Sequence, residues 1–285
     1  KGRVRLAKEI NMGLFNFNLN KEGPGVPKDA PKKKGAARFF EIFTRDFSQI
    51  WLSNLLLLVC AVPMITAVVF SFLFWQYLGV VAIAAVVFLL SNVLLGPALA
   101  SMHTILVKQL CDEPCFFWHE YKKAWKSCWK QAIPVSMLFS AICGMECAAG
   151  IIHLLTAEKP SAILLGMVLL GLYIAVTSWL YATIQLTQMD MKIGPMLKNS
   201  LLLTMGFLKR SLPAGLVILV SVTVLVGFIP WPITFLLAMV GVPAIVALVA
   251  DMWAWPVIEQ VFHISELRAE RREKQRAEEE AAAQV

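Results

Sequence analysis

Glu146 is the residue in this sequence that is best placed to do chemistry, because it is the one Asp, Glu, Lys or Arg in the mostly apolar run from Ala132 to Thr156. A carboxyl group in a hydrocarbon environment is costly, so it commonly serves a solute or a proton, or is held in a packed contact. The nearby Ala149 and Gly150 are small and favour close approach of another helix or the lining of a cavity. We expect a structural carboxyl first and a solute or proton site second.

Other polar side chains lie in comparable apolar runs. Asn54 and Asn92 complete the candidate intramembrane polar site with Glu146, although for both we favour hydrogen bonds between helices over coordination of a solute. Asp251 comes late in the last apolar run, counted from Ile233. We therefore expect its carboxylate to reach water near the headgroups.

The cysteines raise the question of a metal site. Cys111, Cys115, His119 and Cys128 supply soft ligands, but Pro114 interrupts their helical spacing, and zinc modules usually carry tighter Cys-x-x-Cys pairs. The sequence also lacks the phosphate-loop, nucleophile-elbow and His-Glu-x-x-His patterns. We expect no metal, no cofactor, no catalytic residues and no enzymatic activity.

The elements that hold these residues are predicted to be membrane-spanning helices. The chain is 58% hydrophobic and only 16% charged, whereas soluble domains are about 25% charged. Residues 47–107, 161–189 and 211–250 contain no Asp, Glu, Lys or Arg. About 20 apolar residues cross a bilayer as a helix. The fold class predicted is an all-α, polytopic bundle whose six helices cover about 50–74, 78–101, 132–156, 161–186, 212–229 and 233–257.

The basic residues predict the orientation of this bundle. All of the 26 Lys and Arg residues except Lys159 lie before the first helix, in the second and fourth connections, or after the last helix. Basic segments stay on the cytoplasmic side. We expect a multi-pass protein of a bacterial plasma membrane with both termini in the cytoplasm, in contact with anionic lipid headgroups and not with nucleic acid.

A repeat of about 79 residues relates Pro134 and Pro213, each of which follows a basic segment. We interpret the chain as three hairpin-like units with amphipathic cytoplasmic connecting helices. The second connection should lie in the headgroup plane. The candidate lipid- or partner-binding residues in the connections are Trp118, Tyr121, Lys122, Trp125, Lys126, Trp129, Lys209 and Arg210.

The predicted boundaries give three regions. Residues 1–46 form a basic cytoplasmic segment, 47–262 the transmembrane domain, and 263–285 a charged cytoplasmic tail. The first region contains a basic cluster that we expect to contact anionic lipid at about 1 kcal/mol per residue. Its members are Lys28, Lys32, Lys33 and Lys34.

The N-terminal segments Met12–Phe17, Gly23–Lys33 and Phe39–Phe43 resemble the opening of the YesL-like family of bacterial six-helix membrane proteins. The family has no established biochemical activity, and its members are often encoded beside carbohydrate uptake and sensing systems. The resemblance implies an accessory or regulatory partner of such a system, with a carbohydrate ABC transporter or a sensor kinase as its partner. The alternative is a small-solute transporter, or a permease subunit, that uses Glu146.

Overall fold

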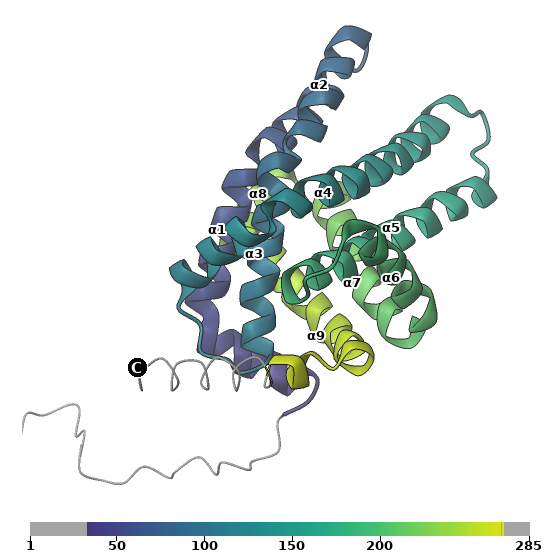
Figure 1. The fold of residues 1–285 in the computed structure, drawn as a ribbon. Helices are drawn as coiled ribbons and strands as arrows, with labels where there is room; N and C mark the ends of the chain where they lie inside the picture. Colours follow the sequence, from purple (N-terminus) through teal and green to yellow (C-terminus); the bar gives the residue numbers. More distant parts are fainter. Residues whose placement is uncertain (1–32, 269, 271–285) are drawn as a thin grey trace, which may run out of the picture. The chain divides into compact units, whose positions relative to one another are not determined.

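The structure is a computed structural model that describes residues 33–268 and 270. By backbone contacts the chain divides into residues 1–38 and 39–285. In the described part every element is a helix (Figure 1). The helices are α1 Ala36–Leu73, α2 Leu78–Leu90, α3 Asn92–Leu110, α4 Phe117–Thr156, α5 Ala162–Gln188, α6 Ile193–Gly206, α7 Leu208–Gly227, α8 Trp231–Val240 and α9 Val242–Phe262.

Six helices or continuous helix pairs in the described residues are long and apolar enough to cross a membrane. They are α1, α2 with α3, α4, α5, α7 and α9, because α6 and α8 are shorter than a crossing requires. This confirms the prediction of an all-α bundle with six spanning helices. The chain is therefore a multi-pass membrane protein.

Several helix boundaries differ from those expected. The second span continues to Leu110, so residues expected in a loop after position 101 are helical. The helix expected over 233–257 is two helices, α8 and α9, with Gly241 between them. The first helix begins at Ala36, inside the segment expected to precede it, and bends at Asp46, whose φ and ψ of −114° and 17° are not helical.

The connection expected as a separate helix in the headgroup plane is instead the first part of α4. Residues 117–156 form one helix of 40 residues that passes through Pro134. Its basic turns therefore continue directly into a spanning helix. A separate connecting helix does occur in the third unit, where α6 ends before α7 at Phe207.

The break between α8 and α9 depends on a glycine and on two side chains from α1. Gly241 has a φ of 118°, which L side chains rarely adopt. The Asn54 amide donates to the Ala238 carbonyl at 2.8 Å and accepts from the Ala244 amide at 3.2 Å. The Trp51 indole donates to the Met239 carbonyl at 3.1 Å. These bonds satisfy helix-end groups that water cannot reach inside a membrane.

Helix α3 is the centre of the packing. It contacts α4, α5 and α9 (Figure 1), and most of its residues are buried. Its apolar side chains Met102 and Leu106 join those of α1 and α9 in one cluster. At Gly96 the α4 backbone comes so close that an added Cβ would lie 2.7 Å from the Ala132 carbonyl oxygen. The absence of a side chain there permits this approach.

Candidate functional site

A histidine and an aspartate meet in the interior between α3 and α9. The Nδ1 atom of His103 lies 2.9 Å from each carboxylate oxygen of Asp251. The Asp251 side chain is fully buried, and the His103 side chain retains 7% of its exposure. A histidine Nδ1–H donates to an aspartate carboxylate in this geometry.

The surroundings of this pair are apolar. Met102, Ala250 and Ala254 are each at most 1% exposed, and they flank His103 and Asp251 along their helices. Removing one member of a buried pair leaves the other group buried without a partner. The resulting loss of stability is larger than the stability that the intact pair contributes. The arrangement can therefore fasten α3 to α9, or hold a proton within the bundle.

The position of Asp251 corrects the expectation that its carboxylate reaches headgroup water. Because α8 ends at Val240 and α9 continues to Phe262, Asp251 lies near the middle of α9, where it is 0% exposed. His103 is not among the predicted site residues, because the run 47–107 was defined by its lack of Asp, Glu, Lys and Arg, and histidine was not counted. A titratable residue in a spanning segment was the available signal.

The three residues of the predicted intramembrane polar site lie at different places. Asn92 is fully buried, donates to Ser140 Oγ at 2.8 Å and accepts from Ser136 Oγ at 2.8 Å, both on α4. Asn54 fastens the α8–α9 break. Glu146 packs on α5, where a Cβ added at Gly171 would lie 2.6 Å from its Oε1 atom. The structure does not bring these residues together into one site.

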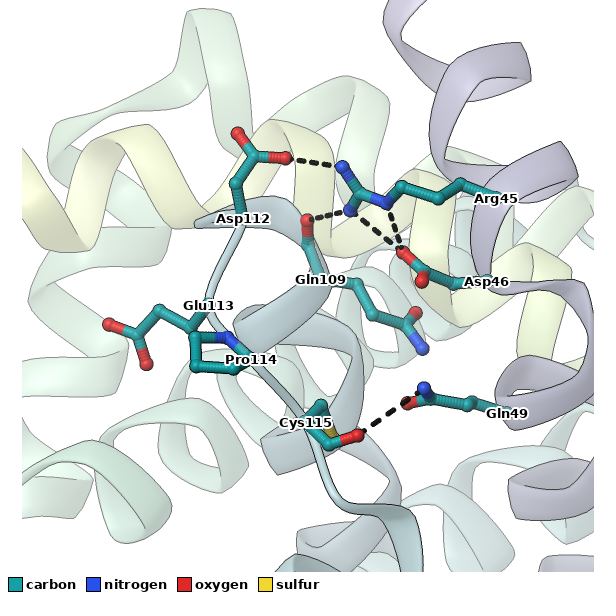
Figure 2. A pocket seen from close by; sticks show the side chains of 8 residues that line it. All are labelled: Arg45, Asp46, Gln49, Gln109, Asp112, Glu113, Pro114 and Cys115. Atoms are coloured by element: carbon teal, nitrogen blue, oxygen red, sulfur yellow. Dashed lines mark hydrogen bonds and ion pairs between the residues drawn. The ribbon is translucent and has the colours of Figure 1, made fainter. Parts of the chain in front are cut away.

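A second polar cluster lies where α1 bends beside the α3–α4 loop (Figure 2). Arg45 donates to Asp112 at 2.6 Å, to Asp46 at 2.7 and 2.9 Å, and to the Gln109 carbonyl at 3.1 Å. Gln49 donates to the Cys115 carbonyl at 3.4 Å. These side chains border a pocket of ≈ 380 Å³, which Glu113 and Pro114 complete.

Two further ion pairs strengthen this end of the bundle. Arg268, which follows α9, bonds Glu113 at 2.8 Å and also donates to Gln188 at the end of α5. Lys108 pairs with Glu120 at 2.6 Å, joining the end of α3 to the start of α4. Contacts from four helices therefore meet here. We call this the polar end of the bundle, defined by Arg45, Lys108, Asp112, Glu113 and Arg268.

The first turns of α4 expose a basic aromatic face, which we define as Trp118, Lys122, Lys126 and Trp129. The two tryptophans are 54% and 45% exposed, and Lys122 Nζ lies 5.9 Å from the Trp118 ring centroid. Both lysines are exposed. Positions 118, 122, 126 and 129 share one side of a helix.

Two aromatic residues predicted for the same surface belong to the interior. Tyr121 is 6% exposed, and Trp125 is partly buried against the cluster that contains Ile42 and Leu106. Their positions turn toward α1 and α3, because α4 is continuous and its inner side is covered. Tyr121 and Trp125 therefore contribute little to the exposed basic aromatic face.

The remaining basic candidates divide into described and undescribed residues. Lys33, Lys34, Lys209 and Arg210 are exposed. Lys28 and Lys32 lie outside the described residues, as do residues 1–31 of the predicted N-terminal region and 271–285 of the predicted tail.

The thiols near the polar end are those of Cys111 and Cys115. Burial raises the pKa of each thiol above its ordinary value. Within the described residues, no three His, Cys, Asp or Glu side chains are grouped so that they could hold a metal ion.

Comparison of this chain with protein-family models, with curated proteins and with solved structures found no match.

Proposed function

We propose that this protein is a non-catalytic accessory or regulatory membrane protein that docks a partner on the basic aromatic face of α4. The partner proposed is a carbohydrate ABC transporter or a sensor kinase. The proposal includes membership of the YesL-like family, a bacterial plasma membrane and cytoplasmic termini. The observation that carries it is the exposure of Trp118 and Trp129 beside Lys122 and Lys126.

The composition of this face supports docking. Tryptophan is the residue most enriched at the energetic centres of protein interfaces. Lysines beside the rings favour an acidic partner surface and speed its approach. The same residues also suit anionic headgroups, so lipid contact at the edges of the face is part of the proposal. The inner side of these turns packs on α1 and α3, which fixes the face on a rigid element.

The alternative, a small-solute transporter that uses Glu146, has less support. The carboxyl group of Glu146 occupies the space above Gly171, so it faces a close helix contact. The pocket at the polar end has no residue in common with that contact. Solute movement past Glu146 would require α4 and α5 to separate.

Site-specific photo-crosslinking in the native membrane tests the proposed docking. A photoreactive amino acid at position 118 or 129 is expected to give adducts with a transporter or kinase subunit during growth on a carbohydrate. The same amino acid at Ile163, which is 78% exposed at the opposite end of the bundle, is the matched control. The double variant Lys122→Glu/Lys126→Glu should reduce the adducts several-fold. Adducts with lipid alone, or equal protein adducts from position 163, would contradict the proposal.

A further inference from the structure

The pocket at the polar end contains an amide group without a partner. The Nε2 and Oε1 atoms of Gln109 are buried and make no hydrogen bond to any described residue, and the residue is 2% exposed. Figure 2 shows this amide extending between Asp46 and Gln49. The Oε1 atom of Gln49 is also buried and unbonded. Such groups each cost about 1–3 kcal/mol when nothing satisfies them.

The chemistry of the lining defines what would satisfy these groups. Among the described residues, the lining includes the carboxylate of Asp46 beside these two amides, together with Asp112, Glu113 and the cationic Arg45. The unbonded atoms of Gln109 and Gln49 are two amide oxygens and one amide nitrogen. The unbonded groups are therefore mostly acceptors, and a carboxylate lies beside them.

We propose that this pocket binds a small organic ammonium ion, such as a primary amine or short diamine. An ammonium group has three N–H donors and no acceptor, which matches the Oε1 atoms of Gln109 and Gln49 beside a carboxylate. The volume of ≈ 380 Å³ holds a ligand of this size. A metal ion is a poorer occupant because the described acidic groups do not form a coordinating cluster.

This inference does not depend on the docking proposed for α4, because the two sites have no residue in common. Cys115 lines the pocket and is partly buried, so its thiol reports occupancy directly. Since burial raises the pKa of this thiol, labelling is best followed at mildly alkaline pH, where more thiolate forms.

The test uses the purified full chain with Cys115 as its only cysteine and the neutral reagent methyl methanethiosulfonate. We expect 1,3-diaminopropane to slow modification of Cys115 several-fold in a saturable manner. Tetramethylammonium carries the charge without N–H donors, and glycerol carries donors without the charge, so neither should protect to the same degree. A lone cysteine at position 198, an exposed site on α6, should show no protection.

Gln109→Leu separates binding from folding. Replacing an unbonded buried amide with leucine should leave the thermal midpoint equal or higher, while the half-maximal diamine concentration rises about tenfold or more, as for loss of a hydrogen bond to a charged group. Gln49→Met should act in the same direction. Absence of protection by the diamine, equal protection by tetramethylammonium, or unchanged protection in both variants would overturn the proposal.

Discussion

Replacement of His103 by leucine is expected to lower the free energy of unfolding by about 3–5 kcal/mol, because Asp251 is left buried without its partner. The carboxylate is 0% exposed, and the described contacts give it His103 alone as a hydrogen-bond partner. The measurement is the unfolding curve of the purified protein in mixed micelles at increasing SDS fraction.

The double variant His103→Leu/Asp251→Leu distinguishes a paired buried charge from simple loss of packing. Replacing both partners with apolar groups of similar volume should recover most of the lost stability, since no uncompensated group remains. His119→Leu, on the exposed surface of α4, is the matched control and should change little. If His103→Leu unfolds like the unchanged protein, the pair does not fasten α3 to α9.

The second large effect is expected at Gly96, where Gly96→Ala should destabilise the fold by about 1–3 kcal/mol through overpacking. The added Cβ would lie 2.7 Å from the Ala132 carbonyl oxygen and 3.0 Å from Ser136 Cβ. The first of these atoms belongs to the backbone of α4, which cannot rotate away. The two helices must therefore separate at their closest approach, next to the hydrogen bonds of Asn92.

Gly166→Ala on α5 is the control for this substitution. A Cβ at that position meets nothing within 4 Å, so alanine should stabilise the helix by about 0.5–1 kcal/mol. Opposite changes in the two unfolding midpoints are the expected result. Equal and small changes would show that α3 and α4 are not held at the distance described.

The spanning helices could be predicted because long charge-free runs have few alternatives in a membrane. The break at Gly241 could not, because it depends on partners far away in the sequence. In the sequence, Gly241 is an ordinary residue of an apolar run. The helix can end there because Asn54 and Trp51 make hydrogen bonds to the backbone groups that the break leaves without partners. Predicting one helix through Gly241 also moved Asp251 toward the membrane boundary.

The candidate site was predictable only in part. Asn92 and Asn54 bond between elements, as favoured from their residue type. The partner of Asp251 could not be found from spacing, because 148 positions separate it from His103. Tyr121 and Trp125 have the aromatic character of a membrane surface, yet they lie on the inner side of α4, which packs against α1 and α3. Residue type alone does not tell an interior aromatic ring from a docking ring.

The orientation of the bundle is the claim on which the docking proposal rests, and cysteine labelling of intact cells tests it most directly. In a cysteine-free background, Lys159→Cys places a single thiol in the loop that follows α4, and Lys126→Cys places one in the first turns of α4. Both positions are exposed. A membrane-impermeant maleimide should label position 159 in intact cells and position 126 only after permeabilisation. Labelling of position 126 in intact cells would contradict the proposed orientation and with it a cytoplasmic docking face.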